Sequence, residues 1–213
     1  MVVEELRASA VAKLIRAHRL IVVLRRVEPA ERLLATVREL VGIGARIFEV
    51  TMDADDASGA IRAVRAAIPA RRTDECLVGA GTIRSRDQLR VATRAGADFG
   101  VSPTFDREVL EDALGSGLPF LPGAYTPTEA DTAWRAGATF VKLFPASSLG
   151  PAHVRELRGP LAEIEVVPTG GIDERNAAAF LEAGASAVGI GSALVKAQPA
   201  ARRAIIAAVR SAP

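Results

Sequence analysis

One lysine stands out among the residues that could do chemistry. The chain carries most of its positive charge as arginine and has only three lysines, Lys13, Lys142 and Lys196. Lys142 lies inside the apolar segment TFVKLFP (139–145), where a permanent charge is costly to bury. A lysine kept away from water can lose its proton and attack a ketone, and the resulting iminium accepts electrons from a neighbouring bond. Lys142 is therefore the candidate nucleophile, although a lysine that reaches solvent or closes an interior ion pair fits the same pattern.

A glutamate in a second apolar segment is the natural companion of this lysine. Glu49 lies within RIFEVTM (46–52), where the neighbouring residues are apolar and predict burial. A carboxyl group in such a place can act as a general acid or base if it reaches a substrate proton directly or through one water. An ion pair with Lys142 or Arg25 would explain the same position. A buried lysine and a buried glutamate on different strands together favour a catalytic role.

Several other residues could bind the charged groups of a substrate. Arg25 ends an apolar segment and can hold a carboxylate through two parallel hydrogen bonds, and the hydroxyls of Thr82 and Thr169 could also position a carboxylate. Glycines in PTGGID (168–173) and GIGSAL (189–194) leave main-chain N–H groups free to bind a phosphate at the start of a helix. Tight turns between a strand and a helix need glycine anyway, so these loops are weak evidence alone.

A protein-bound metal is not expected. The two histidines, His18 and His153, are far apart and have no acidic or cysteine companions at the spacing of metal ligands. Asp53, Asp55 and Asp56 follow a predicted strand and could bind a cation, but acids are also favoured at the helix start that follows. We interpret these acids as favouring the helix start.

The elements that must position these residues alternate regularly. Short apolar segments alternate with helical patterns, and four of the helical patterns end in Gly-Ala, a common helix stop. Ser85, Thr126 with Pro127, and Asp173 are typical of helix starts. The predicted strands are LIVVLR (20–25), RIFEVTM (46–52), CLVGAGT (76–82), DFGVS (98–102), PFLPG (119–123), TFVKLFP (139–145), IEVVPTGG (164–171) and AVGIGS (187–192).

Eight such units predict one α/β domain over residues 1–213, a closed (β/α)8 TIM barrel with an extra N-terminal helix near residues 3–18. An open, doubly wound sheet is the alternative. The barrel is favoured because polar residues gather at the carboxyl ends of the predicted strands, where all would face one mouth. These residues are Arg25, Glu49, Thr51, Thr82, Ser102, Lys142, Thr169 and Ser192.

The composition excludes several other classes of protein. Of the 213 residues, 49% are hydrophobic and 24% are charged, which is typical of a globular domain. The net charge of +2 comes without a basic block, so nucleic-acid binding is not expected. The lone Cys76 precludes an internal disulfide, the first residues do not form a signal-peptide core, and no apolar run is long enough to span a membrane. We expect a cytoplasmic protein.

Taken in order, the motifs FEVTM, GAGT, VSP, LPG, TFVKLFPA, PTGG and GIGSAL identify a family resemblance. Over nearly its whole length, the chain resembles the 2-keto-3-deoxy-6-phosphogluconate (KDPG) aldolases, which are also known as 4-hydroxy-2-oxoglutarate (KHG) aldolases. The resemblance implies a class I aldolase that needs no metal or organic cofactor. It also implies a homotrimer.

The resemblance further implies roles for individual residues. Lys142 would form the Schiff base and Glu49 would shuttle the proton. The other implied contacts are Thr82 and Thr169 beside the pyruvyl group, Pro103 and Phe144 in the pocket lining, and Gly170, Gly171, Gly191 and Ser192 around the phosphate. Some members of the family carry an arginine four residues after the glutamate, where this chain has Asp53. Arg25 fits a second pattern in which an arginine that ends the first strand binds the carboxylate.

Three functions remain open from the sequence. The resemblance favours cleavage of KDPG to pyruvate and glyceraldehyde 3-phosphate, because relatives that act on the galactonate epimer tend to replace the threonine of PTGG. An aldolase that prefers the galactonate epimer or the unphosphorylated 4-hydroxy-2-oxoglutarate is the second possibility. A phosphosugar-binding barrel or oligomeric scaffold without activity is the third.

Overall fold

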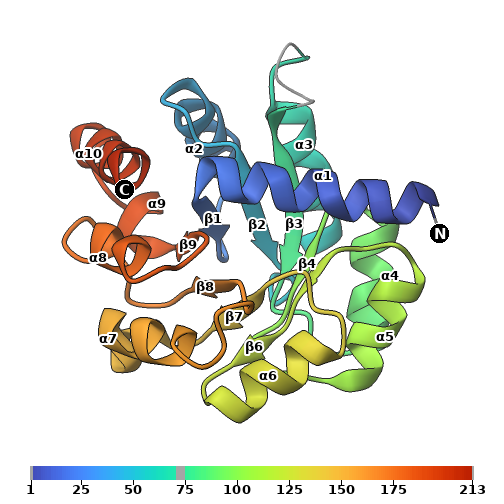
Figure 1. The fold of residues 1–213 in the computed structure, drawn as a ribbon. Helices are drawn as coiled ribbons and strands as arrows, with labels where there is room; N and C mark the ends of the chain where they lie inside the picture. The colour runs from blue at the N-terminus through green and yellow to red at the C-terminus, as the bar shows by residue number, and fades with distance from the viewer. Residues whose placement is uncertain (1, 71–74, 213) are drawn as a thin grey trace.

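The computed structural model describes residues 2–70 and 75–212, and within them strands and helices alternate along the chain (Figure 1). The strands are β1 (Leu20–Leu24), β2 (Ile47–Thr51), β3 (Leu77–Gly81), β4 (Gly100–Val101), β5 (Phe120–Leu121), β6 (Gly123–Ala124), β7 (Val141–Leu143), β8 (Val166–Pro168) and β9 (Val188–Ile190). The helices are α1 (Val2–His18), α2 (Ala30–Gly42), α3 (Ala57–Ala67), α4 (Arg86–Arg94), α5 (Arg107–Gly115), α6 (Pro127–Arg135), α7 (Ala146–Arg158), α8 (Ala177–Glu182), α9 (Ser192–Val195) and α10 (Pro199–Ser211).

The strands of the described residues form two parallel sheets, so the prediction of a closed eight-stranded barrel is wrong. A curled six-stranded sheet has the order β5-β4-β3-β2-β1-β9, and a three-stranded sheet has the order β6-β7-β8. Helices surround both sheets on the outside (Figure 1). The architecture is therefore a curled parallel half-barrel completed by a small second sheet.

Local interruptions explain why the hydrogen-bond ladder does not close. Pro122 separates β5 from β6, so the single predicted strand at 119–123 becomes two short strands that belong to different sheets. Proline has no N–H to donate to a ladder. Where the sheets meet again, a lone bridge joins Thr169 to Gly189 in place of a continuous ladder between β8 and β9. The curled arrangement still aims the carboxyl ends of the strands at a common region.

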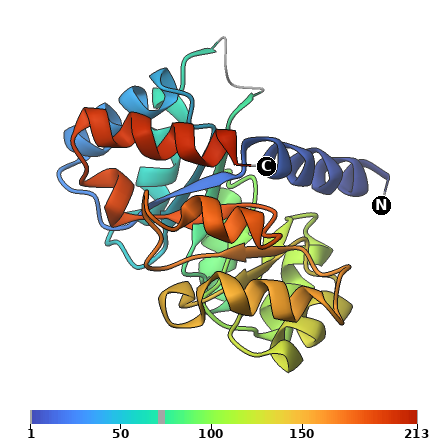
Figure 2. The same ribbon diagram turned by 60° about the vertical axis from the view of Figure 1, so that its left-hand side comes forward.

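The N-terminal helix α1 covers the end of the molecule where the amino ends of the strands lie. Val11, Ala12 and Ile15 of α1 are buried in one cluster with residues of both sheets, including Val101 of β4 and Val167 of β8. Figure 1 shows α1 lying across the sheets, and Figure 2 shows it extending away from them toward the N-terminus. A second, larger cluster of buried residues fills the layer between the strands and the outer helices. Because α1 covers the amino ends of the strands, a substrate must enter from the carboxyl ends.

The helix signals read from the sequence are mostly confirmed. The side chain of Ser85 caps α4, and Thr126 forms a capping box with Glu129 ahead of Pro127. The glycines of all four Gly-Ala pairs adopt a positive φ, between 87° and 110°. The prediction for Asp173 is wrong, because α8 begins at Ala177, after a turn in which Asp173 accepts a hydrogen bond from the N–H of Arg175.

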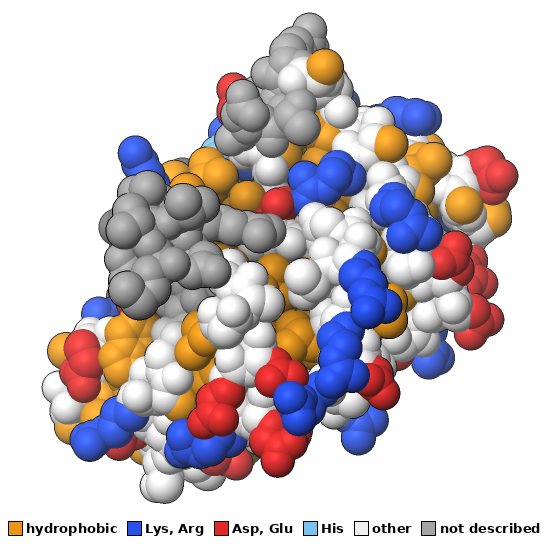
Figure 3. All heavy atoms as spheres, turned by 90° about the vertical axis from the view of Figure 1, so that its right-hand side faces the viewer, with side chains coloured by type: hydrophobic (Ala, Val, Ile, Leu, Met, Phe, Trp, Pro, Cys, Tyr) orange, Lys and Arg blue, Asp and Glu red, His pale blue; other side chains and the backbone are white. Residues whose placement is uncertain are grey.

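Charges of both signs are interspersed on the face formed by α4 and α5. Figure 3 shows basic and acidic side chains next to one another there. Two of the ion pairs on these helices join Arg86 to Asp112 and Arg90 to Asp87. In the described part of the chain, no helix combines the length and the apolar character needed to cross a membrane.

Candidate active site

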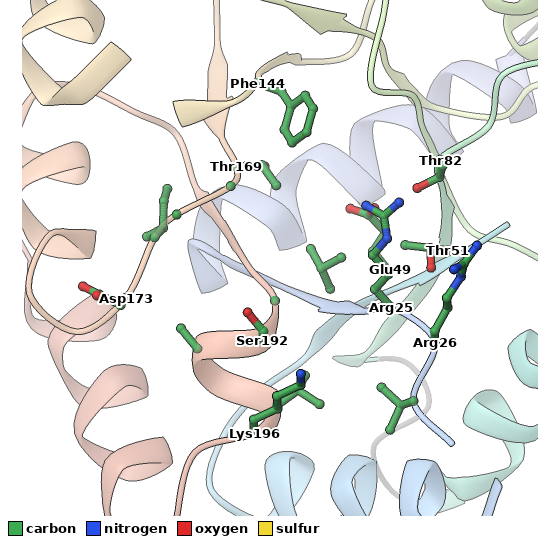
Figure 4. Close-up of a pocket in the computed structure, with 18 of the residues that line it drawn as sticks. Arg25, Arg26, Glu49, Thr51, Thr82, Phe144, Thr169, Asp173, Ser192 and Lys196 are labelled. Atoms are coloured by element: carbon green, nitrogen blue, oxygen red, sulfur yellow. The ribbon is translucent and has the colours of Figure 1, made fainter. Parts of the chain in front are cut away.

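A cavity of about 610 Å³ opens at the carboxyl ends of the strands, and Figure 4 shows residues that line it. Its wall comes from the ends of β1, β2, β3, β7, β8 and β9 and from the segments that follow them. The lining residues are Val23, Arg25, Arg26, Val27, Glu28, Arg32, Glu49, Thr51, Thr82, Lys142, Phe144, Thr169, Gly170, Gly171, Ile172, Asp173, Arg175, Gly191, Ser192, Ala193, Val195 and Lys196.

Most of the residues singled out from the sequence lie together in this wall. Of the eight polar residues at predicted strand ends, seven line the cavity. The exception is Ser102, which is buried and donates a hydrogen bond to the carbonyl of Thr104. Pro103 is also absent from the lining. Its carbonyl group lies 2.2 Å from the position that a Cβ on Gly123 would take, so Pro103 packs closely against that glycine.

Lys142 is held inside the protein with its amine facing the cavity. The residue lies in the middle of β7, between Gly123 of β6 and Val167 of β8, and is only 5% exposed. Its Nζ atom lies 5.2 Å from the centre of the Phe144 ring. No ion pair to Lys142 is present among the described residues, so neither alternative from the sequence applies: the lysine neither extends into solvent nor closes an interior ion pair.

Glu49 reaches the same cavity from β2 and is 2% exposed. Its Oε1 atom is buried and has no hydrogen-bond partner, and it forms no ion pair with Lys142 or Arg25. A buried carboxyl oxygen without a partner is costly and uncommon, so it indicates a group that awaits a ligand or water. Gly81 on the neighbouring strand makes the room, because a Cβ there would lie 1.8 Å from this oxygen.

Two threonines lie on the wall near these groups. Thr82 adopts a left-handed backbone conformation with φ of 58°, which is an outlier for a β-branched residue and is characteristic of functional sites. Thr169 is 8% exposed, and its Oγ1 would lie 2.3 Å from a Cβ on Gly189. Glycine at position 189 therefore leaves the space that the Thr169 side chain occupies.

The loop after β8 is shaped to present its backbone. Gly170 and Gly171 have φ of 93° and 74°, a region that glycine adopts without strain. A Cβ on Gly171 would lie 2.4 Å from the Cβ of Ser147, so a side chain is excluded sterically as well. The N–H groups of these two glycines donate no hydrogen bond to any described residue. They are available to an anion in the cavity.

Arg25, the candidate for binding a carboxylate, is held by an aspartate. Its Nε and Nη2 atoms donate to Oδ2 of Asp53 at 3.1 and 2.8 Å. Burial by itself would raise the pKa of Asp53, but the Thr51 side chain together with Arg25 and Arg26 lowers it below the ordinary range. The interpretation of the acidic loop as helix capping is confirmed for Asp56, which caps α3, and Asp53 instead fixes one edge of Arg25.

Removing this aspartate should weaken substrate binding. Asp53→Ala leaves the Arg25 guanidinium unrestrained, and we expect KM for a substrate that carries a carboxylate to rise about tenfold with little change in kcat. Asp53→Asn keeps an oxygen acceptor and should change KM far less. Because the pKa of Asp53 is lowered, the ion pair stabilises the fold above the ordinary pKa of an aspartate and is lost as pH falls through the lowered value. A lower KM in Asp53→Ala would show that Asp53 competes with substrate instead of positioning Arg25.

Sequence reasoning missed the outer part of the wall. Cations predominate in the lining, where six basic side chains face three acidic ones, which suits a substrate of negative charge. The lysine count was the one signal that could have pointed to Lys196, since the chain uses lysine so rarely. The basic residues of the lining that were not predicted as site residues are Arg26, Arg32, Arg175 and Lys196.

The chemistry available to this wall is addition of an amine to a carbonyl. A buried amine and a buried carboxyl group face one cavity without neutralising each other, and an arginine and free backbone N–H groups lie around them. Among residues 2–70 and 75–212, no cluster of histidine, cysteine or acidic side chains could hold a metal ion. The arrangement suits an imine-forming reaction on a keto acid that carries a second anionic group.

Known proteins show the same combination of fold and sequence. A family model described as KDPG and KHG aldolase matches residues 11–208. The chain is 34% identical over 185 residues to the 2-dehydro-3-deoxy-6-phosphogalactonate aldolase of Escherichia coli. This match covers 86% of the chain and 88% of the relative. It is 39% identical over 162 residues to the 2-dehydro-3-deoxy-phosphogluconate aldolase of Treponema pallidum, with 76% of this chain and 73% of the relative covered.

A solved structure extends the comparison to a trapped reaction state. The KDPG aldolase of Legionella pneumophila, with pyruvate captured at low pH as a covalent carbinolamine intermediate, superimposes with a TM-score of 0.77. The superposition covers 94% of this chain and 97% of that one at 26% sequence identity.

Proposed function

The chain belongs to the KDPG and KHG aldolase family and is a class I aldolase, and we propose that it cleaves 2-keto-3-deoxy-6-phosphogluconate to pyruvate and glyceraldehyde 3-phosphate. The observation that carries the proposal is the pair formed by Lys142 and Glu49. Both side chains are buried, both line one cavity, and neither has its charge satisfied by a neighbouring side chain.

The reaction begins at the amine. Lys142 adds to the C2 ketone of the substrate to form a carbinolamine, and loss of water gives an iminium. The positive nitrogen then accepts the electron pair of the C3–C4 bond. Glu49 removes the proton of the C4 hydroxyl, directly or through one water, so that the bond breaks and the three-carbon aldehyde phosphate leaves.

The second half returns the enzyme to its starting state. The enamine left on Lys142 takes up a proton at C3 to become an iminium, and the carboxyl group of Glu49, protonated in the cleavage step, supplies that proton. Addition of water to the iminium carbon then releases pyruvate and the free amine. The water lost when the first iminium forms is replaced by the water added here, and Glu49 returns the proton that it removed, so the cycle balances without oxidation or reduction.

The remaining wall residues hold the two ends of the substrate. Arg25 binds the C1 carboxylate through the edge of its guanidinium that Asp53 leaves open, with the Thr82 and Thr169 hydroxyls and the Phe144 ring around the pyruvyl group. Gly170, Gly171, Gly191 and Ser192 bind the phosphate through N–H groups and the serine hydroxyl.

A coupled assay of pyruvate release decides among the substrates. We expect the highest kcat/KM for the phosphogluconate, because Thr169 stands where relatives specific for the galactonate epimer tend to carry an apolar residue. The galactonate epimer and 4-hydroxy-2-oxoglutarate serve as the two comparison substrates. A higher kcat/KM for either of them would overturn the proposed substrate, and absence of pyruvate release from all three would overturn the catalytic role of the site.

We also propose that the enzyme is a homotrimer, which the family resemblance supports. One chain has a mass of 22.3 kDa. Light scattering coupled to size-exclusion chromatography should therefore give three times this value. A mass of one or two chains across the micromolar range would contradict the trimer.

A further inference from the structure

Apart from the buried Lys142, two cations of the cavity wall have no acidic partner among the described residues. Arg25 and Arg26 both pair with Asp53, and Arg175 pairs with Asp173. Lys196 and Arg32 also line the cavity, yet within the described residues neither has an ion pair or a side-chain hydrogen bond. An unpaired cation that faces a cavity is available to a ligand.

The two cations lie on the same side of the cavity. Arg32 is in the first turn of α2, which follows β1, and Lys196 comes directly after α9, which follows β9. The two strands are paired, with Val22 opposite Ile190, so the segments that leave their carboxyl ends are neighbours.

Lys196 is also coupled to the loop where the phosphate is expected. The N–H of Lys196 donates to the carbonyl of Ser192 at 3.0 Å, which places the two residues one helical turn apart. Residues at this spacing lie on the same face of a helix. Figure 4 shows Ser192 at the start of the short helix α9 and Lys196 just past its end.

Lys196 and Ser192 lie at the end of the cavity that is far from the reacting amine of Lys142. The Phe144 ring, 5.2 Å from Nζ of Lys142, marks the end where the ketone would react. Figure 4 shows Phe144 and Lys196 at opposite ends of the pocket, with Ser192 on the side of Lys196. A substrate bound at Lys142 through its ketone would extend its other end toward Lys196.

We propose that Lys196, assisted by Arg32, binds the terminal phosphate of the substrate and makes the enzyme select phosphorylated over unphosphorylated keto acids. This inference rests on the proposed function for the identity of the substrate. The backbone N–H groups of the glycine loops hydrogen-bond an oxyanion but carry no full charge. A lysine adds a full positive charge on a flexible side chain, which attracts a phosphate dianion. It does not strengthen the binding of a substrate that ends in an uncharged group or is too short to reach Lys196.

The test compares two substrates in Lys196→Met, which keeps the apolar stem of the side chain and removes its charge. We expect kcat/KM for the phosphogluconate to fall about tenfold and kcat/KM for 4-hydroxy-2-oxoglutarate to stay unchanged. Lys196→Arg should retain most of the activity toward the phosphorylated substrate. Lys13→Met removes an exposed lysine of α1 outside the cavity and should leave both values unchanged. Arg32→Met should also lower kcat/KM for the phosphogluconate alone, but by a smaller factor.

Inorganic phosphate provides a readout that does not depend on turnover. Its dissociation constant, measured by calorimetry, should rise in Lys196→Met and stay the same in Lys13→Met. Equal losses with both substrates, or no loss with either, would overturn the inference while leaving the aldolase intact. Weaker phosphate binding by Lys196→Met in an enzyme that cleaves none of the substrates would support the phosphate contact of Lys196 but overturn the proposed function and, with it, the selection among keto acids.

Discussion

Replacing Lys142 by alanine should reduce kcat/KM for aldol cleavage by about 10⁵-fold, the scale of loss seen when an enzyme is deprived of its covalent nucleophile. The reason is chemical: without the amine, no iminium can accept the electrons of the breaking C3–C4 bond. Lys142→Arg should be equally inactive, because a guanidinium stays protonated and cannot add to a ketone. Pyruvate release, followed in a coupled assay at high enzyme concentration, measures the residual activity of both variants.

Stability provides the control for this substitution. Nζ of Lys142 has no ion-pair partner among the described residues, so its removal leaves no buried countercharge behind. The free energy of unfolding of Lys142→Ala should therefore not fall in the way that breaking a buried ion pair lowers it. A folded Lys142→Ala protein that keeps cleavage within a few fold of the parent would mean that another group does the chemistry.

Glu49→Gln should give the second largest loss, about 10²- to 10⁴-fold in kcat, which is the usual contribution of a general acid or base. Glutamine has nearly the same shape but cannot take up the proton of the C4 hydroxyl. The amine is untouched, so the variant should still form an adduct with pyruvate. Single-turnover measurements would separate slow bond cleavage from imine formation. Loss of adduct formation together with cleavage would assign Glu49 to the first step instead.

Gly81→Ala tests the same carboxyl group without changing it. The added methyl would lie 1.8 Å from Oε1 of Glu49, so the carboxyl group must move away from its position in the cavity. We expect a fall in kcat of at least about tenfold, since small misplacements of a catalytic group are costly. Gly42→Ala is the matched control because a methyl there meets nothing within 4 Å. Full activity in Gly81→Ala would show that the position of Glu49 does not matter.

The sequence was sufficient for the order of the elements but not for the closure of the sheet. Continuous apolar segments between helical patterns predict buried parallel strands, and each of these segments contains a strand in the structure. Whether adjacent strands share a continuous ladder depends on register and on single residues. Pro122 splits one predicted strand into two that join different sheets, and Thr169 keeps one bridge to Gly189. Apolar periodicity contains no information on such pairings.

The inner part of the site could be predicted because it breaks a rule of composition. Lys142 and Glu49 are charged residues inside strands that otherwise bury apolar side chains, and the structure places both within the protein. The outer part breaks no such rule. Lys196 is exposed and ends a four-residue helix, so its sequence context is that of an ordinary surface residue. The pairing of Asp53 with Arg25 joins two segments whose spacing says nothing of contact.

Reduction of the imine in place tests the central claim most directly. The protein is incubated with pyruvate and borohydride, digested, and analysed by mass spectrometry for a lysine that carries the reduced pyruvyl group. We predict one modified peptide, the one that contains Lys142, and loss of activity in proportion to its modification. An adduct on Lys13 or Lys196, or an active enzyme that traps none, would contradict the account.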